Sequence, residues 1–173
     1  MILVAAPSAA ADAVSDRAPS PDAIARHIRT TDGRLHALLH EGLRSSPTLS
    51  AIVHRLLASD VVVYLQCDGA TRSHIAGKLT FLVSAGGYRY VVVRLSQLHR
   101  RENELAILAH ELQHAVEVAD TPAIVDGPSL MREYRRFGFE NRWSSAARMT
   151  FDTHRAVETG NQVLRELTAP SGD

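Results

Sequence analysis

Residues 110–114 read His-Glu-Leu-Gln-His, and this pentapeptide restricts the structure more than any other segment of the chain. Two histidines four residues apart can aim their imidazoles at one point when the segment is a helix, because positions i and i+4 lie one turn apart on the same face. Glu111 lies about 100° around that helix from His110, close to a metal held by the histidines without being a ligand itself. The pentapeptide therefore predicts a helix with two metal ligands, His110 and His114, and a general base, Glu111.

The residues around the pentapeptide predict that this helix, over about 102–119, is anchored in a core. Its apolar residues share one broad side of a helical wheel: Leu105, Leu108, Leu112, Ala115, Val116 and Ala119. His110 and His114 lie on the opposite side, with Asn103 and Glu117. This is the pattern of a helix that buries one face and presents the histidines on a polar stripe. The alternative is a pair of ordinary surface histidines beside a glutamate with no chemical role.

Four further helices or helical regions are expected on local signals. The first covers 31–44, and the second begins at Ser46-Pro47, where a capping residue precedes a proline at the first helical position. A short helix containing Tyr134 is expected to end at Gly138, and a final helix to cover 150–167.

Three strands are expected between these helices, at Val61–Leu65, Lys78–Ser84 and Tyr88–Leu95. The turn Ala85-Gly86-Gly87 joins the last two strands in a hairpin. The order of elements predicts an α+β fold with a small three-stranded, mostly antiparallel sheet packed on helices, and with the histidine helix after the last strand. We expect one domain over residues 22–173, preceded by a disordered leader or signal-peptide remnant at 1–21.

The composition is that of an ordinary globular domain and disfavours several function classes. The chain has 173 residues, 45% of them hydrophobic and 22% charged, with zero formal net charge. A neutral chain has no general attraction for nucleic acid, and a nucleic-acid site at Arg132, Arg135, Arg136 and Arg142 is disfavoured because it lacks interleaved aromatics. We expect Arg135 and Arg136 to form the solvated face of a helix instead. No apolar run approaches the roughly 18 residues that span a bilayer, so no integral membrane segment is expected. Cys67 is the only cysteine, which excludes an internal disulfide and a cysteine zinc site.

The first residues, MILVAAPSAAADA, resemble the end of a secretory signal, with a short apolar stretch followed by small residues. They predict an exported protein, periplasmic or secreted, with a cytoplasmic location as the alternative.

A β strand, a short connection and a helix bearing His-Glu-x-x-His resemble the core of the zincin metallopeptidases, over about residues 88–119. The elongated signature of the metzincin branch would need glycine at position 117 and histidine at position 120, where this chain has Glu117 and Asp120. The gluzincin branch takes its third ligand from a carboxylate on a later helix, and this chain is expected to have such a helix. The resemblance implies a zinc peptidase with His110 and His114 as ligands and Glu111 as general base.

The third ligand is expected to be Asp152, because a helical wheel of 150–167 places it at the edge of the apolar stripe, where a buried carboxylate needs a partner. Glu117, Glu133 and Glu158 are the alternatives. Asp152 could instead serve only as the N-cap of the last helix.

The resulting hypothesis is a zinc-dependent hydrolase, in which zinc with an open position lowers the pKa of a bound water toward about 7 for attack on a peptide carbonyl. Tyr134 and His154 are the preferred candidates to stabilise the developing oxyanion, and Arg135 and Arg136 are alternatives. Peptides or proteins are the expected substrates, and the hairpin could offer an edge to an extended peptide. The competing hypothesis is a non-catalytic module that binds a metal or a protein partner on the same scaffold.

Overall fold

The computed structural model describes residues 19–68, 76–96, 100–140 and 151–169. Within these ranges the elements are, in chain order, α1 (Pro21–His27), β1 (Ile28–Arg29), α2 (Gly33–Ser45), α3 (Pro47–Leu57), β2 (Val61–Cys67), β3 (Gly77–Ala85), β4 (Tyr88–Leu95), α4 (Arg101–Asp120), α5 (Gly127–Phe137), β5 (Phe139–Glu140), β6 (Phe151–Asp152) and α6 (His154–Thr168). The predicted α+β class is confirmed. Most of the predicted leader, as well as Arg142, lies outside the described residues.

The sheet differs from the expected one. It has four strands in the order β1-β2-β4-β3, in which β1 and β4 both run parallel to β2 and only β3 and β4 are antiparallel. The prediction of three mostly antiparallel strands is therefore wrong. The hairpin formed as expected, but β4 rather than β3 pairs with β2, so β3 lies at the edge of the sheet. The apolar run of β2 is typical of a strand inside a parallel array, and β1, with two residues, is too short to give a periodic signal.

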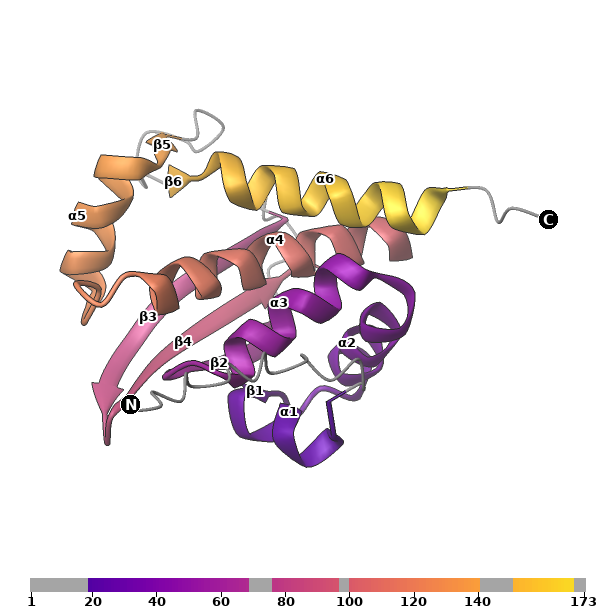
Figure 1. Cartoon of the computed structure of the whole chain (residues 1–173), viewed down its shortest axis with the longest axis horizontal. Helices are drawn as coiled ribbons and strands as arrows, with labels where there is room; N and C mark the ends of the chain where they lie inside the picture. The colour runs from indigo at the N-terminus through magenta and orange to yellow at the C-terminus, as the bar shows by residue number, and fades with distance from the viewer. Residues whose placement is uncertain (1–18, 69–75, 97–99, 141–150, 170–173) are drawn as a thin grey trace, which may run out of the picture.

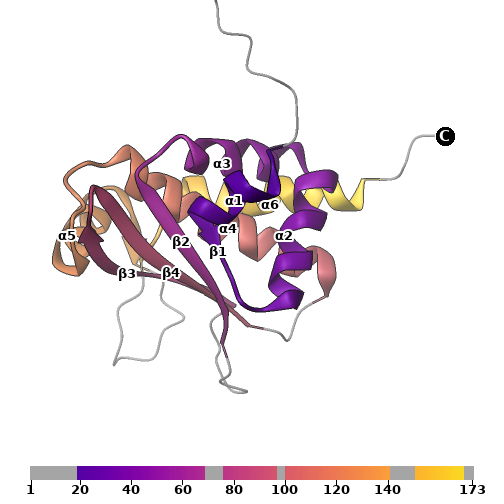
Figure 2. The same cartoon turned by 90° about the horizontal axis from the view of Figure 1, so that it is seen from below.

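Helix α4 lies between the sheet and α6 (Figures 1 and 2). Its leucines form the main core with the strands and with α2 and α3, as its apolar side predicted. Its other side packs against α6 and β3, and Glu111, Gln113, His114 and Glu117 are all buried, while His110 remains partly exposed. Gly160 of α6 permits this close approach, because a Cβ there would lie 3.2 Å from the Ala106 carbonyl oxygen and 3.4 Å from His110 Cβ.

The C-terminal end of α4 is held by one buried arginine. Arg89 of β4 donates to the backbone carbonyls of Val118, Ala119, Thr121 and Ile124. The same guanidinium makes two hydrogen bonds, of 2.6 and 2.8 Å, to the carboxylate of Asp60. These bonds satisfy carbonyls that a helix end leaves without partners, and they tie the end of α4 to the sheet.

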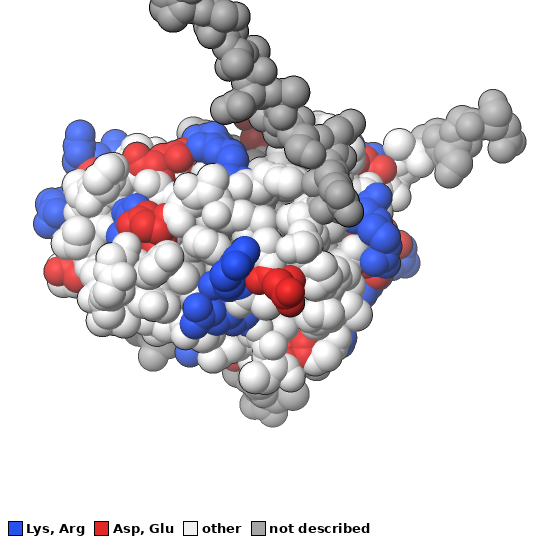
Figure 3. Space-filling model, turned by 60° about the horizontal axis from the view of Figure 1, so that its bottom comes forward, with Lys and Arg blue, Asp and Glu red and all other residues white. Residues whose placement is uncertain are grey.

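Among the described helices, none is both long and apolar enough to cross a membrane. On the face that Figure 3 shows, acidic and basic side chains are interspersed on a largely uncharged surface, without the extended basic stripe typical of a nucleic-acid site.

Candidate metal centre

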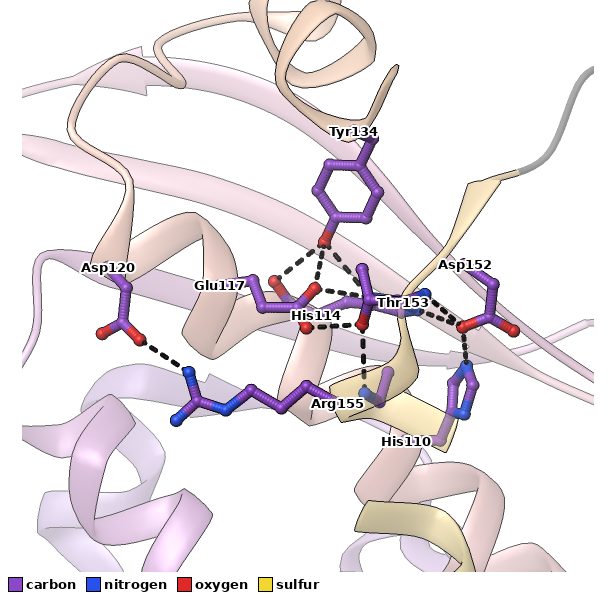
Figure 4. A network of polar contacts seen from close by, with 9 residues as sticks. His110, His114, Glu117, Asp120, Tyr134, Asp152, Thr153 and Arg155 are labelled. Atoms are coloured by element: carbon purple, nitrogen blue, oxygen red, sulfur yellow. Dashed lines mark hydrogen bonds and ion pairs between the residues drawn. The ribbon is translucent and has the colours of Figure 1, made fainter. Parts of the chain in front are cut away.

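His110 and His114 of α4 meet the carboxylate of Asp152 (Figure 4). Asp152 Oδ1 lies 3.3 Å from His110 Nε2 and 3.5 Å from His114 Nε2. One donor atom from each of the three residues lies within 4.8 Å of the others. In the described part of the chain, no other group of three histidine, cysteine or acidic side chains comes as close. Two imidazoles and a carboxylate on three sides of one point can hold a divalent metal ion.

Asp152 reaches this point from a strand and not from a helix. It belongs to β6, where it pairs with Phe139 of β5 in a two-stranded ribbon. Gly138, which ends α5, lets the ribbon fold tightly, since a Cβ there would be 2.7 Å from the Asp152 carbonyl oxygen. The predicted helix over 150–167 is therefore wrong at its start, and the wheel that singled out Asp152 did not apply to it. Its alternative role as N-cap is also wrong, because Thr153 caps α6 by accepting from the Ala156 amide.

A second layer of polar side chains lies behind His114. Glu117, one turn further along α4, places Oε2 2.9 Å from His114 Nδ1. Tyr134 of α5 donates its hydroxyl to the same oxygen at 2.9 Å, and Thr153 donates to Glu117 Oε1 at 2.6 Å. Figure 4 shows these contacts converging on one carboxylate. Glu117 is thus engaged on the Nδ1 side of His114, and Asp152 rather than Glu117 faces the Nε2 atoms.

These contacts revise the role predicted for Tyr134. Its hydroxyl is committed to Glu117 and lies 3.1 Å from His114 Nδ1, on the opposite edge of the ring from Asp152. It therefore does not face the point where a metal or a substrate carbonyl would lie. Burial and the neighbouring Glu117 carboxylate raise the pKa of Tyr134 well above its ordinary value, so the phenol remains a donor.

The other predicted residues lie outside the cluster. His154, at the start of α6, is exposed and packs its ring against Phe139 at a centroid distance of 4.8 Å. Glu133 pairs with Arg136 at 2.5 Å, and Glu158 is exposed. Arg135 and Arg136 are exposed on α5, which agrees with a solvated face.

Glu111 is buried beneath β3. Only 5% of the residue is accessible, and it accepts a hydrogen bond from the Leu79 backbone. Burial raises the pKa of Glu111 above its ordinary value, which outweighs the opposing effect of His114 and His110. A carboxylate whose affinity for a proton is raised in this way suits a general base.

The electrostatics of the centre favour a positive charge between the carboxylates. Burial by itself would lower the pKa of His114, but hydrogen bonds to Asp152 and Glu117 outweigh it and raise the pKa to about 10. Burial would raise the pKa of Asp152, but hydrogen bonds to His110 and His114 outweigh it and lower the pKa. The carboxylates around the histidines therefore favour positive charge at this point, so the residues present fit a divalent metal.

Sequence reasoning did not identify the roles of Glu117 and Thr153, or the close approach of Gly138 to Asp152. A threonine before a helix and a glutamate on the histidine face were visible signals, but the two residues bond to each other across different helices, and Glu117 also contacts Tyr134 of α5. Comparisons of the chain with protein-family models, with curated proteins and with solved structures find no match.

Proposed function

We propose that the chain is a zinc-dependent hydrolase that cleaves peptide bonds, with His110, His114 and Asp152 as zinc ligands and Glu111 as the general base. The observation that carries this proposal is the convergence of the three ligand side chains beside Glu111, with donor atoms within 4.8 Å of one another. Three protein ligands that leave one position open are the usual arrangement of a catalytic zinc site, whereas structural sites use four.

The donor set supports zinc over a harder cation. Calcium and magnesium prefer sites made of oxygen atoms, whereas two imidazole nitrogens and one carboxylate oxygen suit zinc. Glu117 adds further support, because a histidine ligand commonly donates its second ring N–H to a carboxylate.

The chemistry assigns separate tasks to the residues of the centre. A bound zinc ion supplies Lewis acidity, which polarises a carbonyl and makes water acidic enough to act as a nucleophile near neutral pH. Glu111 takes the proton from the attacking water and passes it to the leaving amine. His154 remains the candidate for holding the oxyanion, since its exposed side chain follows Asp152 by two residues.

The position of β3 supports a peptide substrate. It is an edge strand, paired with β4 on one side only, and it covers Glu111. An extended peptide can add to such an edge through backbone hydrogen bonds, which would place a scissile bond near α4. The deep burial of Glu111 limits its access to a substrate and favours the alternative of a metal-binding module with no turnover. Metal content and peptide hydrolysis, measured separately, distinguish the hydrolase from this module.

The test begins with metal content. The purified chain is expected to bind about one zinc ion, measured by elemental analysis after dialysis. His36 and His40 lie one turn apart on α2, with ring centroids 4.4 Å apart, so a His36→Ala variant controls for zinc bound at the surface. Failure of this variant to take up any zinc would refute the metal centre.

The second step is a digest of a broad peptide library by the zinc-loaded protein. Glu111→Gln is expected to keep zinc and lose hydrolysis, because the residue handles a proton and binds no metal. His110→Ala is expected to lose both. Cleavage by Glu111→Gln at the wild-type rate would refute the role of Glu111, and a zinc-loaded protein that cleaves no peptide would support the non-catalytic module.

A further inference from the structure

We propose that Glu117 is a positioning residue that joins the two halves of the metal centre. One carboxylate oxygen orients His114 of α4, and the other holds Asp152 in place through Thr153. This inference rests on the zinc centre proposed above, but it concerns contacts within the chain and does not depend on peptide hydrolysis.

The contacts of the Glu117 carboxylate determine which nitrogen of His114 carries a proton. Three groups contact the Glu117 carboxylate, and two of them, the hydroxyls of Tyr134 and Thr153, donate to it. The 2.9 Å contact between His114 Nδ1 and Glu117 Oε2 must then also carry a proton, which only the imidazole can supply. Glu117 therefore keeps a proton on His114 Nδ1, so that Nε2, the nitrogen at the point shared with Asp152, is the one that can give up its proton to bind a metal.

Thr153, which follows Asp152 in the chain, links Glu117 to the carboxylate of Asp152. The Thr153 hydroxyl donates to Glu117 Oε1 at 2.6 Å and accepts from the Ala156 amide at 3.0 Å. The Thr153 backbone amide donates to Asp152 Oδ1 at 2.7 Å, the same oxygen that faces both imidazoles. Thr153 thus connects Glu117 directly to the carboxylate that reaches the metal position.

Burial makes these bonds hard to replace. Glu117 is 7% accessible, Thr153 4% and Tyr134 6%, so water cannot readily substitute for a lost partner. A buried group that loses its partner costs more than the bond itself contributed. Removal of Glu117 therefore leaves His114 free to rotate or change tautomer, and it releases the β6–α6 junction from α4.

The adjacent contact between the same two segments supplies a matched control. Asp120, one turn beyond Glu117, pairs with Arg155 of α6 at 3.4 Å and also with Arg55 of α3 at 2.7 Å. The side chains of Asp120 and Arg155 are 42% and 55% accessible, and neither touches the histidines. A variant at Asp120 tests whether any contact between α4 and the start of α6 would have the same effect.

The experiment measures zinc affinity by competition with a chelator for the wild type, Glu117→Gln, Thr153→Ala, Thr153→Ser and Asp120→Asn. A glutamine at position 117 would replace one accepting oxygen by an amide NH₂, which cannot accept from His114 or from Thr153. Glu117→Gln is therefore expected to weaken zinc binding by about 10–100-fold. Thr153→Ala should weaken it in the same direction, Thr153→Ser should restore it, and Asp120→Asn should leave it unchanged.

A second readout separates orientation from general stability. Nitrogen NMR of the zinc-loaded protein is expected to show His114 protonated at Nδ1 in the wild type and in Asp120→Asn, and to show a changed signal in Glu117→Gln. If Glu117→Gln fails to fold, the Thr153→Ala and Thr153→Ser pair still tests the connection. The double variant Glu117→Gln/Thr153→Ala should lose less affinity than the two single losses combined, because both act through one carboxylate.

The outcomes distinguish this inference from the proposed function. Wild-type zinc affinity in both Glu117→Gln and Thr153→Ala would overturn the positioning role and leave the zinc centre intact. An equal loss in Asp120→Asn would also overturn it, because a general loosening of α6 would then explain the effect. A wild-type protein that binds no zinc would overturn the proposed function as well.

Discussion

Gly77 and Glu111 are in such close contact that no side chain fits between them. A Cβ on Gly77 would lie 2.6 Å from Glu111 Oε1 and 2.7 Å from its Cγ. Gly77 begins the edge strand β3, so the strand and the carboxylate can occupy their present positions only with glycine at this point. The backbone of Gly77 has no unusual conformation, and the requirement is therefore one of space.

This contact predicts the effect of Gly77→Ala. The added methyl group must displace Glu111 or β3, at a cost of about 1–3 kcal/mol of stability. The zinc content should remain at the wild-type level, whereas peptide hydrolysis should fall by about tenfold or more, since positioned general bases contribute roughly 10²–10⁴. Gly33→Ala is the control, because nothing lies within 4 Å of a Cβ there. Equal activity in the two variants would show that Gly77 does not position Glu111.

Asp152→Asn should lower zinc affinity by orders of magnitude. The substitution removes the charge that faces His110 and His114, while the cap of α6 belongs to Thr153 and is retained. Chelator competition measures the affinity, with Glu158→Gln as a control at an exposed carboxylate of α6. Unchanged affinity in Asp152→Asn would mean that another group completes the centre.

Arg89→Leu should destabilise the fold by about 1–3 kcal/mol, because it leaves the carbonyls at the end of α4 without the donors that the buried Arg89 supplies. The Arg89 side chain is 8% accessible. Arg55→Leu is the matched control, since Arg55 pairs with Asp120 at 2.7 Å but is 44% accessible, and surface pairs contribute about 0–1 kcal/mol. Chemical denaturation measures the free energy of unfolding of both variants. Similar losses in Arg89→Leu and Arg55→Leu would show that the buried position of Arg89 has no special effect.

The Asp60–Arg89 pair also predicts an acid-sensitive component of stability. The hydrogen bond from Arg89 lowers the pKa of Asp60 below the ordinary value of 3.8. A lowered pKa in the folded state stabilises the protein above the unfolded-state value, and this contribution is lost as pH falls through the lowered value. Asp60→Asn should therefore be less stable than the wild type at pH 7, and the difference should shrink below about pH 4. A difference that does not change with pH would contradict this origin.

The helices were the most predictable part of the fold because their signals are local. Ser46 followed by Pro47 marked the start of α3, and its hydroxyl does accept from the Leu49 amide. The sheet order depends on which strands meet across long stretches of chain, and the apolar residues of β2 and β4 fit either direction. The sequence pattern therefore predicted the three long strands well and their pairing poorly, and it missed the short elements α1, β1, β5 and β6.

The candidate metal centre was likewise predictable where its residues lie close together in the sequence, and not where they come from distant segments. His110, Glu111 and His114 could be placed by helical spacing within five residues. Asp152 was selected on a helix that does not include it, and it reaches the histidines because Gly138 and Phe139 fold a ribbon beside them. The contact of Glu117 with Thr153 forms because α6 packs on α4, and the residue spacing within either helix does not predict that packing.

The position of α4 between the sheet and α6 has a consequence for how long a metal ion would stay bound. Amide protons in a helix covered on both sides exchange with deuterium only when whole elements separate, so α4 belongs to the slowest-exchanging part of the protein. The β5–β6 ribbon has two residues in each strand, all partly or fully exposed, and Phe151 packs against the edge of the core. Two of the proposed ligands, His110 and His114, thus lie on the slowest-exchanging helix, whereas the third, Asp152, lies on a short and partly exposed strand. If the centre binds a metal ion as proposed, we expect the ribbon, rather than α4, to release its ligand first.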